Sequence, residues 1–422
     1  MTAKAPNGAG RSPLLFIFLT VFIDLLGFGI VIPLLPVYSK AYGASELMLG
    51  LLFAAFSGMQ LLFAPVWGRL SDRIGRKPIL VGGLFGTSLS YVLFAYSNSF
   101  ELLMLSRLLA GFFGANISTA QAYIADVTTP ENRAKGMGLI GAAFGLGFTL
   151  GPGIGGELTH ISASAPGWFA AGFSCAAAIF GWINLPEPEH KPGVTRIFGF
   201  GQVVRAIGEP RIGVLFVLSY TFIFAFSSFE AMFTRFGLAR FPSVFNVPAN
   251  LESATMEDVL AAAPIAGRYL MGIGIISALI QGGLIRRLVP RYGETKLAVA
   301  GPLLLGLGFL VVGLATTWTW VIVGCLIMPL GFGLNNPALT SLVSRASPER
   351  EQGSFLGLNQ SVSSFARMTG PPFAGLVFAY GPEVPFLIGA GLLGCSCLLA
   401  RWYHGRFGAT FPKKAQVPAT GV

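Results

Sequence analysis

Long apolar segments recur along the chain and are separated by short polar stretches. Twelve of them lie near residues 14–36, 47–67, 78–97, 101–125, 136–159, 165–185, 212–236, 265–285, 296–315, 318–343, 354–379 and 384–403. A segment of about 20 apolar residues is long enough to cross a bilayer. It must do so as a helix, because backbone polar groups in lipid have to pair within the segment. The pattern therefore predicts an all-α polytopic membrane protein with twelve transmembrane helices.

The composition agrees with this prediction. Hydrophobic residues make up 53% of the chain and charged residues only 11%, whereas soluble domains are about 25% charged. The 56 glycines fit helices that pack closely through small residues. No small-residue cleavage site follows the first apolar segment, which contains Asp24, so we expect a retained first helix and not a removed signal peptide.

The basic residues predict the orientation of the chain in the membrane. The net charge is +10, but the lysines and arginines lie between the apolar segments and not on a basic soluble domain, so nucleic-acid binding is not expected. Most of them fall on one side if the N-terminus is cytoplasmic, as the positive-inside rule requires. We therefore expect both termini in the cytoplasm and the chain in a plasma membrane, the inner membrane in a bacterium.

Enzyme chemistry and metal binding are not indicated. The four cysteines all fall inside predicted spans, which implies neither a disulfide framework nor a zinc site. The three histidines lie outside the spans, and there is no metal-ligand cluster, nucleophile elbow or phosphate loop. We expect no metal and no cofactor.

The chain is predicted to consist of two halves of six spans each. The polar region 186–211, which contains three prolines, is expected to be a cytoplasmic linker between residues 1–185 and 212–422. Pro130-Glu131 recurs as Pro348-Glu349, and Gly151-Pro152 recurs as Gly370-Pro371 at almost the same separation. Transporter folds are often built from such repeats.

A short, densely charged stretch separates the second and third spans. It is expected to be a turn with Gly68 and Gly75 at its bends and with Asp72, Arg73 and Arg76 between them. This pattern, G-x-L-S-D-R-x-G-R-K, resembles the signature between the second and third helices of the major facilitator superfamily of transporters. The stretch can also be interpreted as an ordinary basic cytoplasmic turn.

Two charged residues lie well inside predicted spans of the first half, away from the ends of these spans. Asp24 is in the middle of the first span, where a carboxylate is costly unless it pairs or faces water. Arg107, in the fourth span, is the expected partner, since an arginine stays charged and can bias Asp24 toward ionisation. The pair would couple transport to protons. The alternatives are an Asp24 that only holds helices together and a static ion pair.

The fifth span contains a run of glycines around a proline. Gly147, Gly151, Gly155 and Gly156 allow neighbouring helices to approach, and Pro152 removes a backbone hydrogen bond and bends the helix. A packing seam would explain such a run by itself. Its form, G-x-x-x-G-P-x-x-G-G, resembles the antiporter motif of drug-exporting facilitators.

Taken together, the chain resembles the twelve-span drug:proton antiporters of the major facilitator superfamily, most closely the tetracycline-efflux-like branch. Four elements match in order: the Asp24 motif, the charged stretch 68–80, the Arg107 motif and the glycine-proline motif. The resemblance implies a latch at the cytoplasmic helix ends that holds the outward-open state. Its residues would be Gly68, Asp72, Arg73, Gly75, Arg76 and Asp126.

The chain departs from the tetracycline exporters in the positions of its charges. The third, eighth and ninth spans lack the acidic residues and the histidine of that branch, which puts tetracycline itself in doubt as a substrate. Glu230 in the seventh span and Arg367 in the eleventh are expected to form a second pair that binds substrate or couples to protons, or a structural salt bridge. Arg235 is expected to be a simple anchor near the external surface.

A central cavity lined by aromatic and amide side chains is expected to bind the substrate. The candidate residues are Phe28, Gln60, Asn116, Gln121, Phe226, Glu230, Asn335, Asn336, Gln360 and Arg367. An apolar cavity with a few polar groups suits an amphipathic organic ligand. The external segment 237–264 is long and includes a possible short helix at 251–262.

The leading hypothesis is that a monomer in the lipid bilayer exports a hydrophobic or amphipathic small molecule in exchange for protons by alternating access. A proton-coupled importer or facilitator of a small metabolite is the second hypothesis, which the glycine-proline motif disfavours. A receptor or scaffold that transports nothing is the third, and it predicts that Asp24→Asn leaves function intact.

Overall fold

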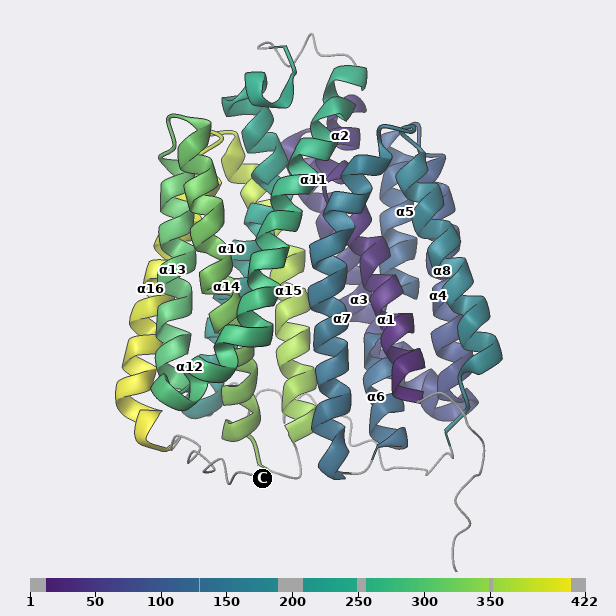
Figure 1. Cartoon of the computed structure of the whole chain (residues 1–422), viewed down its shortest axis with the longest axis vertical. Coiled ribbons are helices and arrows are strands. Elements are labelled where there is room, and N and C mark those ends of the chain that lie inside the picture. The colour runs from purple at the N-terminus through teal and green to yellow at the C-terminus, as the bar shows by residue number, and fades with distance from the viewer. Residues whose placement is uncertain (1–12, 129, 189–207, 249–255, 349–351, 411–422) are drawn as a thin grey trace, which may run out of the picture.

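The structure is a computed structural model that describes residues 13–128, 130–188, 208–248, 256–348 and 352–410 (Figure 1). All regular elements within these ranges are helices. The first set of helices comprises α1 (Pro13–Val31), α2 (Leu34–Ala41), α3 (Glu46–Ile74), α4 (Arg76–Ala95), α5 (Phe100–Phe113), α6 (Ile117–Val127), α7 (Pro130–Leu158) and α8 (Ala165–Asn184).

The second set contains longer helices and three short irregular ones. It comprises α10 (Pro210–Arg240), η1 (Pro242–Phe245), α11 (Met256–Leu279), the π-helix η2 (Ile280–Leu284), α12 (Ile285–Tyr292), α13 (Glu294–Gly313), α14 (Trp318–Ala346), α15 (Gln352–Phe378), α16 (Val384–Phe407) and η3 (Gly408–Thr410).

Each of the twelve predicted spans coincides with one helix or with consecutive helices. Among the described residues, ten helical segments are long and apolar enough to cross a membrane. The two remaining long helices, α7 and α15, lie among them (Figure 1). The predicted all-α polytopic fold is confirmed.

Two predicted spans are each interrupted by a short non-helical stretch. The first span ends at Val31 and resumes at Leu34, because Pro33 has no N–H to continue the hydrogen-bond ladder. The fourth span is interrupted at residues 114–116 between α5 and α6. The expected separate short helix at 251–262 is wrong from residue 256 onward, where the chain is already in α11. Residues 249–255 lie outside the described ranges.

The charged stretch between the second and third spans is mostly helical. Helix α3 continues through it to Ile74, so Gly68 is inside a helix and the expected bend there is wrong. Only Gly75 forms the turn, with φ of 104°, a conformation that a side chain would strain. Asp72 and Arg73 therefore occupy the last turn of a helix, and Arg76 begins the next one.

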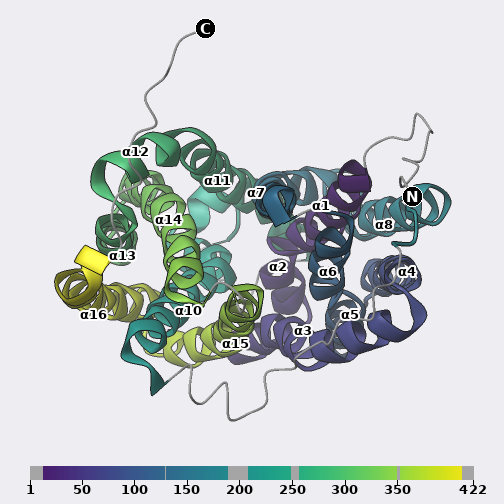
Figure 2. The same ribbon diagram turned by 90° about the horizontal axis from the view of Figure 1, so that it is seen from below.

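The two sets lie side by side and meet along two seams. Figure 2 shows α1–α8 grouped on one side and α10–α16 on the other. Helix α7 packs against α11, and α3 packs against α15. The upper end of the molecule in Figure 1 carries α2 and is called the α2 end; the lower end carries the Gly75 turn and is called the latch end.

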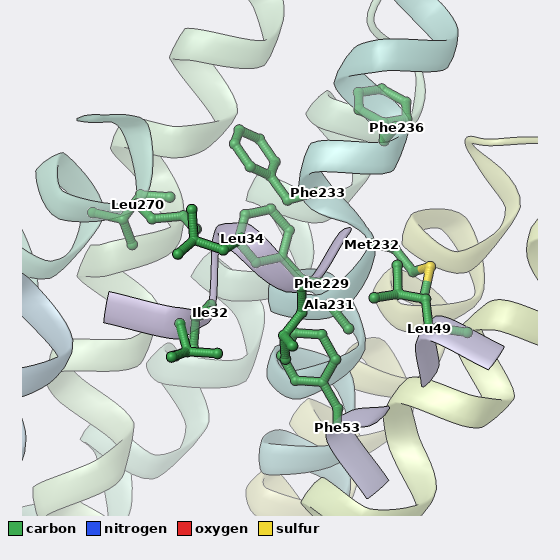
Figure 3. Packing of buried hydrophobic residues seen from close by; sticks show 14 of the residues in the cluster. Ile32, Leu34, Leu49, Phe53, Phe229, Ala231, Met232, Phe233, Phe236 and Leu270 are labelled. Atoms are coloured by element: carbon green, nitrogen blue, oxygen red, sulfur yellow. The ribbon is translucent and has the colours of Figure 1, made fainter. Parts of the chain in front are cut away.

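The largest hydrophobic cluster joins the two sets toward the α2 end. Figure 3 shows Ile32, Leu34, Leu49 and Phe53 of the first set against aromatic and aliphatic residues of the second. The second set contributes Phe229, Ala231, Met232, Phe233, Phe236 and Leu270. Burying a large apolar side chain contributes about 1.5–3 kcal/mol, so this cluster holds the two sets together at that end.

Candidate functional site

A cavity lies where both sets contribute side chains. Most of its wall comes from the first set, and α15 of the second set supplies Gln360 and Arg367. The polar and charged lining residues are Asp24, Ser57, Gln60, Thr87, Tyr91, Gln360 and Arg367, and the aromatic ones are Phe28, Phe56 and Phe148. Of the expected substrate-binding residues, Phe28, Gln60, Gln360 and Arg367 are thus brought together around Asp24.

Asp24 lines this cavity but does not form the expected ion pair with Arg107 in the described part of the chain. Its carboxyl group lies beside Thr87 and interacts electrostatically with Tyr91. Asp24 also lines a second, smaller cavity together with Asn116. The carboxyl group is therefore exposed to two cavities and has no fixed cationic partner among the described residues.

Arg107 is buried against aromatic rings and not against a carboxylate. The side chain is 1% exposed. Its Cζ lies 5.2 Å from the ring centroid of Phe94 and 5.8 Å from that of Tyr91. Neither Nη1 nor Nη2 has a hydrogen-bond partner among the described residues. Cation–π contacts stabilise such a charge only in part, so the site retains attraction for a negative group.

Tyr91 lies between the two charges that were expected to meet. It interacts electrostatically with both Asp24 and Arg107. A Cβ at Gly27, one turn after Asp24 on α1, would lie 2.8 Å from the Tyr91 hydroxyl oxygen. Sequence reasoning missed this residue, although Thr87 and Tyr91 are polar positions one turn apart on the third span. Two serines on the same helix, Ser88 and Ser90, donate to backbone carbonyls.

Arg367 and Glu230 interact electrostatically but form no hydrogen bond or ion pair with each other. Each is half-buried, and each interacts with the other's charge. No hydrogen bond or ion pair of Arg367 is present in the described part of the chain. The expected salt bridge between α10 and α15 is therefore absent in this conformation, although the two charges are close enough to influence each other.

The remaining expected cavity residues have varied environments. Phe226 packs on Phe332, with ring centroids 4.2 Å apart. Asn335 is fully buried against Gly301 of α13, so it lies outside the cavity lining. Asn336, the next residue on α14, is exposed, and Gln121 is half-buried on α6. Neighbouring positions on a helix point in different directions, which explains why two adjacent asparagines cannot share the site.

The glycine-proline motif packs α7 against two helices at once. A Cβ at Gly147, Gly151 or Gly155 would lie 2.8, 2.6 or 2.1 Å from α1, the helix that carries Asp24. On another face, a Cβ at Gly156 would lie 2.7 Å from the Ala263 carbonyl of α11. A Cβ at Gly267 of α11 would lie even closer to the Pro152 carbonyl oxygen of α7. The motif thus joins the Asp24 helix to the second set.

The predicted latch residues form a charged cluster at the latch end. Arg76 Nη1 lies 2.6 Å from Asp72 Oδ1, and Arg76 Nε lies 3.0 Å from Asp126 Oδ2. Glu187, after the last helix of the first set, accepts hydrogen bonds from the backbone N–H groups of Arg76 (2.6 Å) and Lys77 (3.0 Å). It thereby caps the free N-terminus of α4. Arg73 is exposed.

The second set repeats this arrangement with the charges reversed. Gly293 has φ of 81° and precedes α13, as Gly75 precedes α4. The following residue is Glu294, whose Oε2 lies 2.7 Å from Arg345 Nη1 on α14. Every ion pair named here at the latch end joins elements of one set.

At the α2 end, by contrast, polar contacts cross between the sets. Arg235 of α10 is 4% exposed, so its expected role as a simple surface anchor is wrong. Its Nη2 donates to Ser39 Oγ (3.3 Å) and to the Ala44 carbonyl (3.1 Å). Its Nη1 lies 3.8 Å from Glu46 Oε1. Burying the guanidinium requires these acceptors, so the α2 end is closed by polar contacts as well as by apolar packing.

The architecture of two helix sets around a polar cavity matches that of a known family. The family model of the Major Facilitator Superfamily matches residues 17–371 and 255–420. The chain belongs to the Major Facilitator Superfamily. It is therefore a multi-pass membrane transporter and not an enzyme, as the sequence predicted.

Similar members of the superfamily include drug-efflux proteins. The chain is 32% identical to Multidrug resistance protein 1 of Bacillus subtilis, over 87% of this chain and 90% of the relative. It is 31% identical to the class C tetracycline resistance protein of Escherichia coli, over 95% and 99%. It is 30% identical to the quinolone resistance protein NorA of Staphylococcus aureus, over 92% and 96%.

Solved structures support the same fold. The human organic anion transporter MFSD10 (TETRAN) superposes with a TM-score of 0.67 at 26% identity, over 92% of this chain and 98% of that one. A bacterial homologue of the lysosomal transporter Spinster, in an inward-facing and occupied conformation, gives a TM-score of 0.76 over 96% and 100%, at 15% identity.

Proposed function

We propose that this transporter exports a hydrophobic or amphipathic small molecule in exchange for protons. The observation that carries the proposal is the cavity that is lined by both Asp24 of the first set and Arg367 of the second. Asp24 has no fixed cationic partner there, so its carboxyl group is free to take up and release a proton. The similarity to multidrug, tetracycline and quinolone resistance proteins supports export over other directions of transport.

Alternating access follows from the way the two sets are joined. Residues 1–185 and 212–422 act as two halves that rock about the cavity, with the seams α3–α15 and α7–α11 as the surfaces that slide. The basic residues favour a cytoplasmic latch end, by the positive-inside rule. The conformation described here, closed at the α2 end, then corresponds to a state closed to the outside.

Proton coupling acts through the charge of Asp24. Ionised Asp24 and Arg107 act on Tyr91 with opposite charge, and protonation of Asp24 removes the first of these two interactions. Because α1 packs on the glycine face of α7, and α7 packs on α11, a shift of α1 reaches the second half directly. Glu230 and Arg367 form a second pair of charges that responds to substrate. In the outward-open state, the cluster of Asp72, Arg76 and Asp126 latches the cytoplasmic helix ends.

The test is proton movement in everted membrane vesicles. A fluorescent probe of the pH gradient would report its collapse when amphipathic compounds, tetracycline included, are added. We expect compound-triggered proton release in the wild type and none in Asp24→Asn. Glu101→Gln, which removes an exposed carboxylate from α5, is the matched control and should behave like the wild type. If labelled compounds cross without proton release in the wild type, the antiport mechanism is wrong and a facilitator is favoured.

A further inference from the structure

The cavity has an unusual distribution of charge and aromatic surface. Its two charged lining residues come from opposite sets, Asp24 from α1 and Arg367 from α15. Gln60 and Gln360 line the same cavity. Gln60 already donates to the Gly114 carbonyl at 3.1 Å. The wall therefore presents a carboxyl group from one set and a guanidinium from the other.

The guanidinium of Arg367 is available to a ligand. Its side chain is half-buried at the cavity, and no hydrogen bond or ion pair holds it within the described part of the chain. Glu230, its anionic neighbour on α10, does not reach ion-pair distance. A guanidinium carries five N–H donors in a planar fork, whose geometry matches a carboxylate. A buried cation with unused donors favours an anionic partner.

Aromatic rings cover the part of the cavity wall nearest Asp24 on α1. The ring centroids of Phe28 and Phe56 are 4.4 Å apart, and those of Phe28 and Phe148 are 5.3 Å apart. These rings come from α1, α3 and α7. Flat aromatic ligands pack favourably on such surfaces by offset stacking or edge contacts. The cavity thus offers one surface for rings and one cation for an anionic group.

We propose that the preferred substrates are aromatic amphiphiles that carry a carboxylate. The carboxylate binds Arg367 in a bidentate manner, and the ring system lies on Phe28, Phe56 and Phe148. A cationic group on the same molecule, as in a zwitterion, would face Asp24 and compete there with the proton. This inference rests on the proposed export function and names the substrate class of the same site.

The experiment compares rhodamine B, which carries an aromatic carboxylate, with its ethyl ester, which is identical except that the carboxylate is blocked. Uptake would be measured in proteoliposomes with an acidic lumen, so that protons leave as compound enters, and protein-free liposomes would give the passive rate. For the wild type we expect rhodamine B to be preferred by about ten- to a hundredfold, the effect of a charge-assisted hydrogen bond.

Variants locate the preference at Arg367. Arg367→Gln should lose the preference by slowing rhodamine B at least tenfold more than it slows the ester. Arg367→Lys should keep part of the preference. Arg240→Gln, which removes an exposed arginine from the end of α10, is the matched control and should keep all of it. Continued movement of the ester by Arg367→Gln shows that this variant is folded.

The outcomes separate the two proposals. A wild type that moves the ester as fast as the acid overturns the substrate class, whatever the variants do. Equal slowing of both probes in Arg367→Gln also overturns it. Proton-coupled movement of ethidium, a cation without a carboxylate, but not of rhodamine B would leave export standing and overturn the carboxylate preference. No movement of any of the three compounds would overturn both proposals.

Discussion

The buried Arg235 is expected to stabilise the state in which the α2 end is closed. Replacing it by glutamine keeps a polar side chain but removes the charge and the long reach to the first set. In the closed state the guanidinium donates two hydrogen bonds, to Ser39 and to the Ala44 carbonyl. In an open state these donors would face water. The substitution therefore acts on the equilibrium between the two states.

The magnitude follows from the contacts of the guanidinium. Hydrogen bonds from a charged donor contribute about 1.5–3 kcal/mol each. The Nε of Arg235 is buried without a hydrogen-bond partner in the described ranges, and this desolvation cost offsets about 1–3 kcal/mol of the stabilisation. The Glu46 side chain is 34% exposed and 3.8 Å away, so screening leaves that ion pair about 0–1 kcal/mol. A net stabilisation of about 2–3 kcal/mol changes the closed-to-open ratio by about 30- to 150-fold.

The assay is a distance measurement across the α2 end by double electron–electron resonance. Spin labels at Lys40 on α2 and at exposed Ser243 on η1, in a cysteine-free background, would report the separation of the two sets. Arg235→Gln should add a population at longer distance, and Glu46→Gln should have a much smaller effect. Arg240→Gln is the control for charge on the same helix. An unchanged distance distribution in Arg235→Gln would refute the assignment of Arg235 to closure.

Three further predictions follow from the described contacts. Tyr91→Phe keeps the ring over Arg107 but removes the hydroxyl beside α1. Proton-coupled transport should therefore slow about fivefold, the effect of one polar contact of about 1 kcal/mol, and Tyr91→Ala should slow it more. Equal rates for wild type and Tyr91→Phe would contradict this role. Gly151→Val should lower the thermal unfolding temperature of the purified protein, because its Cβ would lie 2.6 Å from Gly29 and overpacking costs about 1–3 kcal/mol. The control is Gly145→Ala, whose Cβ would meet no atom within 4 Å, and it should leave the unfolding temperature unchanged. Glu294→Arg and Arg345→Glu should each destabilise the protein, because each places two like charges where the present, largely buried pair is 2.7 Å apart. The double variant should recover most of the loss in the same unfolding assay. Failure of the double variant to recover would argue against a direct pair.

The predictions that succeeded depended on neighbouring residues along one helix. The spans could be placed because each must satisfy its own backbone in lipid, a requirement that the sequence of a single segment reveals. The ion pairs of Arg76 with Asp72 and Asp126 agree with the charged cluster that the family resemblance implied, while its role as a latch stays a prediction. The Gly68 bend was wrong, because nothing in the local sequence shows that a polar helix will continue to Ile74 beyond the membrane.

The predictions that failed concerned contacts between distant helices. Whether Arg107 meets Asp24 or Tyr91 depends on the rotation of α5 about its axis, and a rotation of one residue position moves a side chain by about 100°. Asn335 and Asn336 show the same effect, since one is fully buried against α13 and the other is exposed. Periodicity within one helix gives the relative directions of its side chains but not the helix that each will contact.

The amino-acid sequence by itself predicted the helical spans, because lipid imposes this constraint on each segment separately. Its motifs indicated the family, which the family model confirms. Only the tertiary structure decided which charges are paired. Glycine faces on α7 set how closely α1 and α11 approach, and that approach positions Asp24 opposite Arg367 and Arg235 beside Ser39. The physical reason is that an ion pair is sensitive to differences of a few ångströms, and such distances arise from the packing of the whole helix bundle.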